Sequence, residues 1–161
     1  MKLLDEKTVE ILNYRIQQEE LSSRLYHQMS LWLETESYRN LTKLFATYSN
    51  EEIKHAGWAK EYLLSFNVMP ELRTLEEPVN VFTSIQDIAQ KTLEHEILIT
   101  EQCNDLAKYA FTESDFGLLT LAQKYNSEQI EELNKATNLL DIVNMSNDKL
   151  VIDTYVGENL L

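Results

Sequence analysis

The sequence predicts an all-α fold in which four long helices form a bundle and a short fifth helix follows. Three observations support this prediction. Glycine and proline are scarce, at 3 and 2 of 161 residues, whereas sheets and irregular folds need more turn residues. Four long segments show helical periodicity in their apolar residues. One long connection, which contains both prolines, separates these segments into two pairs.

The first two helices are expected over residues 5–34 and 38–66, because apolar residues there recur at steps of three and four. Only a few residues join them, so they should lie antiparallel as a hairpin. The stretch that follows, residues 67–82, contains Pro70 and Pro78. Proline removes a backbone donor and clashes with the preceding turn of a helix, so this stretch cannot be one continuous helix.

The third helix is expected over residues 84–111, the fourth reaches Val143, and a short fifth helix is expected over residues 147–157. Capping side chains precede the last two bundle helices, namely Thr83 or Ser84 for the third and Ser114 with Asp115 for the fourth. A short link makes these two helices a second hairpin, and the middle connection of about 16 residues can run the length of a bundle. We expect two hairpins joined by one long crossover in a single domain, residues 1–161, whose bundle spans residues 5–143.

Charge and composition narrow the function. Acidic residues outnumber basic ones by 27 to 14, and the formal net charge of −13 disfavours nucleic acids and anionic membranes and suits a protein that handles cations. The single cysteine, Cys103, excludes an internal disulfide framework and is expected as a small buried residue. Residues 1–6 show no signal-peptide pattern, and no apolar run approaches transmembrane length. We therefore expect a cytoplasmic protein.

The apolar stripe of every bundle helix is interrupted near its middle by charged or strongly polar residues. The interrupting residues are Glu19 in the first helix, Glu52 and His55 in the second, Glu96 in the third, and Gln129 and Glu132 in the fourth. Antiparallel helices of similar length bring their midpoints to one level. These side chains should therefore converge in one buried layer.

Four carboxylates in a protein core repel one another and are costly to desolvate, so they stay ionised only around compensating positive charge. No Lys or Arg is expected on these stripes at that level, which leaves bound metal ions as the simplest source of charge. Carboxylates with one imidazole suit iron or manganese better than a thiolate-preferring ion. Glu52 and His55 lie one turn apart on one helix face. The Glu52–His55 spacing alone is weak evidence for a metal site. The expected position of polar residues from all four helices at one level of the bundle is the evidence that indicates such a site.

Other polar residues lie near this layer. The acidic residues that adjoin the stripes, and form either a solvated face or a third cation site, are Glu51, Glu128 and Glu131. Tyr26 is either a core residue or a phenol that gives the metal centre an electron or a hydrogen bond. His27 and His95 lie off the stripes and are expected on the surface or in an interface.

Six segments together carry a family resemblance. They are Leu12-Asn13 with Ile16 and Glu19, Ser22-Ser23, Leu25-Tyr26 through Gln28-Met29-Ser30, Glu51-Glu52-Ile53-Lys54-His55-Ala56, Leu93-Glu94-His95-Glu96, and Ser127-Glu128-Gln129-Ile130-Glu131-Glu132. At these residues, and over nearly its whole length, the chain resembles the bacterial non-haem ferritins. The resemblance implies a ferritin-like fold, ferroxidase activity with O2 or H2O2, storage of ferric mineral, and a homo-oligomeric shell of 24 subunits whose fourfold axis is lined by the fifth helix.

The resemblance also implies residue roles. It places Glu19, Glu52 and His55 at a first iron, and Glu52, Glu96 and Glu132 at a second, with Glu52 as the bridge. Further matches are Gln129 near the oxygen-binding side of the pair, Tyr26 beside the centre, and Glu51, Glu128 and Glu131 as a third iron site.

Two departures from relatives matter. Haem-binding relatives carry a Met after the helix-two glutamate and a second Glu-x-x-His in helix four. The corresponding positions are Ile53, Gln129 and Glu132, so no haem is expected. Many relatives have a Trp just before the helix-four motif, where this chain has Lys124.

Three functions fit the sequence. The first is an iron-storing ferroxidase, which the complete ligand set favours. The second is a shell that sequesters iron with little catalysis. The third is a di-iron oxygenase acting on an organic substrate, which would need an apolar pocket that opens at the metals.

Overall fold

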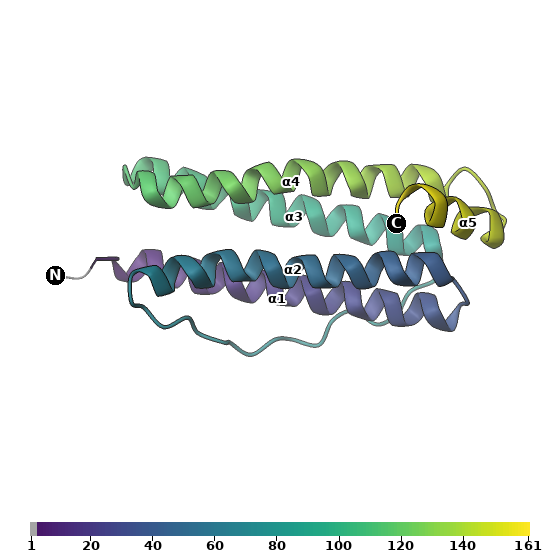
Figure 1. The fold of residues 1–161 in the computed structure, drawn as a ribbon, viewed down its shortest axis with the longest axis horizontal. Coiled ribbons are helices and arrows are strands. Elements are labelled where there is room, and N and C mark those ends of the chain that lie inside the picture. Colours follow the sequence, from purple (N-terminus) through teal and green to yellow (C-terminus); the bar gives the residue numbers. More distant parts are fainter. Residues whose placement is uncertain (1–2) are drawn as a thin grey trace.

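The computed structural model describes residues 3–161, so the first two residues of the N-terminal stretch lie outside it. Its five helices are α1 (Glu6–Thr35), α2 (Arg39–Ser65), α3 (Ile85–Thr112), α4 (Phe116–Val143) and α5 (Lys149–Asn159). Figure 1 shows α1 beside α2 and α3 beside α4 as two antiparallel hairpins, which confirms the predicted fold. Each helix boundary lies within two residues of the expected position. None of the helices in this range has the length and apolar character needed to cross a membrane.

Three of the bundle helices, α1, α3 and α4, begin at a side chain that caps them. Asp5, Ser84 and Asp115 each accept a hydrogen bond from the backbone amide three residues later. This contact satisfies an amide that has no partner within the helix. Ser84 and Asp115 are therefore the caps, and the neighbouring candidates Thr83 and Ser114 are not.

Three helices end in the same motif without using glycine. Ser37, Asn67 and Ser114 follow α1, α2 and α3 with positive φ angles of 67°, 58° and 57°. After α1, the Tyr38 amide donates to the Leu33 carbonyl at 3.0 Å, and equivalent backbone bonds follow α2 and α3. These bonds satisfy the last carbonyls of each helix. Serine and asparagine thus make the tight helix ends of a chain that has only three glycines.

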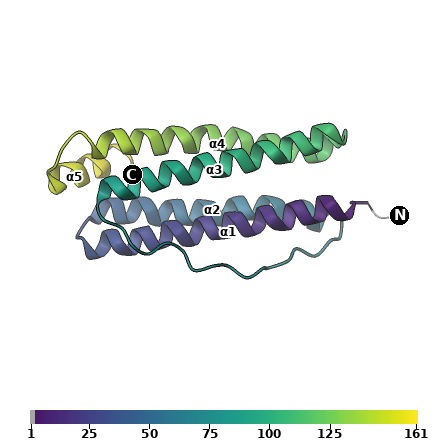
Figure 2. The same ribbon diagram turned by 180° about the vertical axis from the view of Figure 1, so that it is seen from behind.

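The crossover, residues 66–84, runs along the α1–α2 hairpin, as Figure 2 shows from behind. Its backbone is held by polar side chains of α1. The Glu71 amide donates to Asn13 Oδ1 at 2.9 Å, and Gln17 Nε2 donates to the Thr74 carbonyl at 2.8 Å. The chain therefore returns to the far end of the bundle, where α3 starts.

Two apolar clusters fill the bundle and leave a polar layer between them. One cluster contains Met29 and Phe45, near the end that carries α5. The other contains Leu12 and Ile16, near the start of α1. On α1 the two clusters flank Glu19. The polar layer predicted from the sequence therefore lies between two apolar parts of the core.

Helix α5 packs against the start of α2. The Asp153 carboxylate accepts hydrogen bonds from the backbone amides of Arg39, Asn40 and Leu41, at 2.9–3.1 Å. It therefore caps a helix that is distant in the sequence. A Cβ at Gly157 would lie 2.4 Å from Asn40 Nδ2, so a larger residue there would displace the Asn40 side chain, which donates to the Asp153 carbonyl.

Candidate metal centre

Four helices place their polar interruptions in one buried layer. The members, each at most 5% exposed, are Glu19 on α1, Glu52 and His55 on α2, Glu96 on α3, and Gln129 and Glu132 on α4. All of these residues were predicted from the helical stripes. The structure brings them together as expected.

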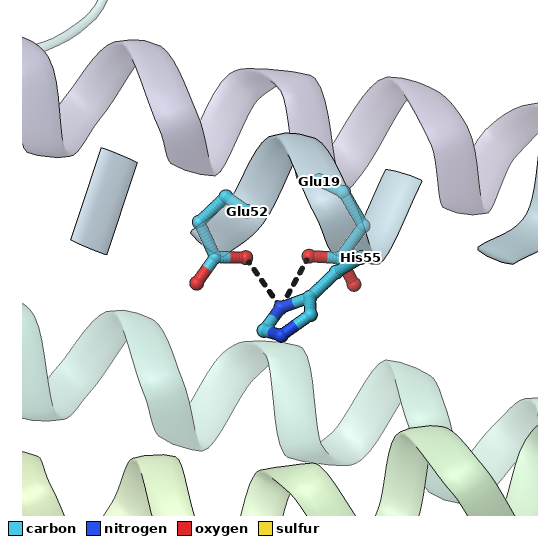
Figure 3. A group of neighbouring side chains, drawn as sticks. All are labelled: Glu19, Glu52 and His55. Carbon is cyan, nitrogen blue, oxygen red and sulfur yellow. Dashed lines mark hydrogen bonds and ion pairs between the residues drawn. The ribbon is translucent and has the colours of Figure 1, made fainter. Parts of the chain in front are cut away.

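Within the layer, ligand atoms gather into groups of a size that suits a metal ion. His55 Nδ1 lies 3.3 Å from a Glu52 oxygen and 3.9 Å from Glu19 Oε2 (Figure 3). A second group joins Glu52 to Glu96 and Glu132, and the atoms of each group lie within 4.8 Å of one another. Glu52 belongs to both groups, so two cations held there would be neighbours.

Two neutral side chains orient Glu96. The Tyr26 hydroxyl donates a hydrogen bond to Glu96 Oε1. Gln129 Nε2 donates to Glu96 Oε2 at 3.0 Å and to Thr100 Oγ1 at 3.2 Å. Both oxygens of this carboxylate therefore have a fixed direction, as is usual for a metal ligand.

The three residues of the expected third site do not gather in one place. Glu128 lies 3.4 Å from His55 Nε2 and forms a metal-sized group with His55 and Glu132. Glu51 is half-buried and contacts Lys135, and Glu131 is exposed. The sequence did not predict that Glu128 would reach His55.

Burial makes the carboxylates hard to ionise without a cation. It raises the pKa of Glu19 well above the ordinary value, although the nearby Arg15 opposes the shift. It raises the pKa of Glu52 to about 8, with further contributions from the neighbouring carboxylates Glu96 and Glu132. It raises the pKa of Glu132 to about 7, against the influence of Lys135. The metal-free cluster therefore retains protons that a bound cation would displace.

Two basic side chains among residues 3–161 reach the cluster, although neither lies on an apolar stripe, as expected. Arg15 is 2% exposed, and its Nε lies 3.1 Å from Glu19 Oε1. Lys135 Nζ lies 3.1 Å from Glu132 Oε1. Each cation stands one turn from its partner on the same helix, so its long side chain carries the charge along the helix to the cluster.

These two cations do not saturate the cluster. Four buried carboxylates face them, and Lys135 is shared with Glu51. Glu19 Oε2 is enclosed and has no hydrogen-bond partner among residues 3–161. An orphaned carboxylate oxygen beside the His55 imidazole is a fitting ligand for iron, and carboxylates with imidazole also suit manganese.

Aromatic side chains cover the His55 side of the centre. The Trp58 ring lies 4.8 Å from the His55 ring and 5.2 Å from the Tyr125 ring, measured between centroids. Lys124 places its ammonium 4.2 Å from the Trp58 centroid. The Trp58 indole of α2 thus lies beside the centre, and Lys124 of α4 lies over its ring. The stripes of separate helices could not reveal this contact between helices.

The other two histidines differ in exposure. His27 is exposed, as expected. His95 was expected on the surface or in an interface, but it is half-buried, lies 2.7 Å from Ser22 Oγ and packs edge-on against Tyr26. Burial lowers its pKa. Cys103 is buried, as predicted.

Comparison with known proteins places this arrangement in a family. The ferritin-like domain family matches residues 9–146. A bacterial non-heme ferritin of Escherichia coli O6:H1 is 31% identical over 144 residues, which cover 89% of this chain and 87% of that protein. A bacterial non-heme ferritin of Campylobacter jejuni is 29% identical, over 96% of this chain and 95% of the relative.

A solved structure shows the same fold. The open pore ferritin of the archaeon Archaeoglobus fulgidus aligns with a TM-score of 0.92 at 26% identity, and the alignment covers 98% of both chains. The family match spans most of the sequence, and the likeness in structure extends over nearly all of it. The chain therefore belongs to the ferritin family.

Proposed function

We propose that this protein stores iron and oxidises ferrous ion at the buried centre, with O2 or H2O2 as the oxidant. The observation that supports this best is the position of Glu52 in two adjoining metal-sized groups. Two ferrous ions held side by side can each give one electron to the same oxidant. Family membership supports iron as the metal.

The residues have distinct roles in this proposal. Glu19 and His55 hold one ion, Glu96 and Glu132 hold the other, and Glu52 bridges the two. Gln129 and Tyr26 orient Glu96 through their hydrogen bonds, and Tyr26 is proposed as an electron donor. Glu128, which reaches His55, is proposed together with Glu51 and Glu131 as a weaker third iron site, although only Glu128 belongs to a metal-sized group.

Storage requires an enclosed space, which one bundle does not provide. We propose a homo-oligomeric shell of 24 subunits that holds ferric mineral, as the family membership suggests. The whole chain would act as one domain in that shell, with α5 at the fourfold axis. We further propose that the shell works in the cytoplasm, where ferrous ion is available.

The experiment that tests this proposal is anaerobic loading with ferrous ion, followed by oxygen. The initial rate of ferric absorbance is measured for the wild type, Glu52→Gln and the control Glu20→Gln. Glu20 lies beside Glu19 on α1 but pairs with Lys60 at 3.4 Å. Loss of a group that hydrogen-bonds to a metal ligand costs about 10–100-fold in metal sites, so loss of the bridging ligand itself should slow the fast phase by at least about 100-fold.

The control variant should oxidise iron as fast as the wild type, because Glu20 belongs to none of the metal-sized groups. A Glu52→Gln rate equal to that of wild type would refute the ligand assignment. A wild type that binds ferrous ion but shows no fast phase would refute the ferroxidase and leave sequestration.

A further inference from the structure

Lys135 holds a position between two carboxylates at the edge of the centre. Its Nζ lies 3.1 Å from Glu132 Oε1 and 3.3 Å from Glu51 Oε2. Glu132 is buried in the cluster, whereas the Glu51 side chain is 31% exposed. The ammonium therefore joins an inner carboxylate on α4 to an outer one on α2.

The contacts of Lys135 with Glu51 and Glu132 lie at the surface between α2 and α4, at the edge of the cluster. A groove of about 180 Å³ opens there, and its lining includes Tyr48, Glu51, Asn134 and Lys135. The Lys135 ammonium also lies 5.8 Å from the Tyr48 ring centroid. A cation that bound at this edge of the centre would meet the lysine.

The lysine side chain is an ammonium on a flexible stem, and its two carboxylate partners hold it at this position. A metal ion that took Glu51 as a ligand would have to break two charge-assisted hydrogen bonds and face the displaced ammonium.

We propose that Lys135 is a built-in competitor of the third iron, occupying Glu51 and Glu132 so that the outer position binds metal weakly. The proposal deepens the proposed function and rests on it. Among the inner ligands Lys135 contacts Glu132 alone, through Oε1, whereas its other partner, Glu51, belongs to neither inner group. Removal of the lysine should therefore act most strongly on the outer position. The third site of this chain then fills only when the lysine moves aside.

The test is a calorimetric titration of the assembled protein with ferrous ion under strictly anaerobic conditions. The variants are Lys135→Met, which keeps the length of the stem and removes the charge, and Lys135→Arg, which keeps the charge. Lys60→Met is the matched control, because Lys60 forms a similar interhelical pair with Glu20 at 3.4 Å, away from the cluster. The double variant Lys135→Met with Glu51→Gln removes the outer ligand as well.

We expect two tight ions per subunit in every one of these proteins, with a weaker third ion in the wild type. A contact made by two charge-assisted hydrogen bonds should weaken the third ion by at least about tenfold, so Lys135→Met should tighten it by that factor. Lys135→Arg and Lys60→Met should behave as wild type, and the added Glu51→Gln change should cancel the gain.

The outcomes separate the two proposals. A wild type without two tight ions would overturn the proposed di-iron centre, whatever the third ion does. Two tight ions with the same third-ion affinity in Lys135→Met and wild type would overturn the role of Lys135 alone. Equal tightening in Lys60→Met would also overturn it, because the gain would then reflect the net charge of the subunit. Circular dichroism of each variant confirms that the bundle is intact.

Discussion

The Lys124 ammonium lies over the Trp58 indole, 4.2 Å from the ring centroid. Cations bind favourably to the electron-rich face of an indole, so the lysine holds the ring in place. The same ring packs on the imidazole of His55. Helix α2 therefore supplies an indole next to the candidate ligand, and α4 contributes Lys124 rather than a second indole. Because the two rings are in contact, the fluorescence of Trp58 should respond to a metal ion bound at His55.

We predict that ferrous ion, added without oxygen, quenches the fluorescence of Trp58 strongly and that of Trp32 little. The chain has only these two tryptophans. Trp32 packs on Phe82 and lies 13 residues beyond Glu19, or about 20 Å along α1. The measurement compares Trp32→Phe, which retains Trp58, with Trp58→Phe. Stronger quenching in Trp58→Phe than in Trp32→Phe would contradict a metal site at His55.

The metal-free protein should lose stability as the pH rises from about 6.5 to 8. Burial raises the pKa of Glu52 to about 8 and that of Glu132 to about 7, from an ordinary value of 4.5. The folded state then binds more protons than the unfolded state in this range, so the free energy of unfolding falls as those protons leave. The lowered pKa of His95 has the opposite effect, but only below about pH 6.5.

Thermal unfolding of the metal-free protein across this pH range measures the effect. Glu52→Gln cannot ionise at this position, so its melting temperature should depend less on pH than that of the wild type. Ferrous ion should reverse the trend, because the metal binds the ionised carboxylates and its affinity rises as they lose protons. A metal-free wild type that became more stable over the same range would show that the cluster is ionised without metal.

Asp153→Ala should destabilise the subunit by about 1–2 kcal/mol, the usual cost of losing a helix N-cap. The Asp153 carboxylate satisfies three amides at the start of α2, where the local N-cap residue Tyr38 makes no side-chain bond. Chemical denaturation measures the change, and Asp141→Ala on the exposed face of α4 serves as the control. Equal stability of the two variants would mean that solvent satisfies these amides as well as Asp153 does.

The sequence was sufficient for the helices and for the polar layer, because one periodic signal determines both. A residue on an apolar stripe is buried once the helix packs, so Glu96 and Gln129 could be placed by counting turns. The helix ends were also close to expectation. Their exact positions depend on left-handed residues such as Ser37 and Asn67, and these positions more commonly hold glycine.

The polar contacts around the layer could not be predicted in the same way. Arg15 and Lys135 lie off the stripes, and only the three-dimensional packing shows that their long side chains reach the buried carboxylates. Asp153 caps a helix more than a hundred residues earlier in the chain. His95 lies one position from Glu96, and its burial depends on how closely α1 approaches α3 at Ser22. Such contacts depend on rotamers and on the distance between helices, which periodicity does not encode.

The two metal-sized groups that share Glu52 differ in how they depend on the fold. Glu19, Glu52 and His55 all lie on the first hairpin, whereas the group of Glu52, Glu96 and Glu132 exists only after the second hairpin docks. A half-made or damaged chain therefore offers at most one of the two places. A lone ferrous ion can pass only one electron to oxygen, and that transfer yields superoxide. In the proposed ferroxidase, the oxidation of two paired ions is therefore possible only when both hairpins are folded and docked.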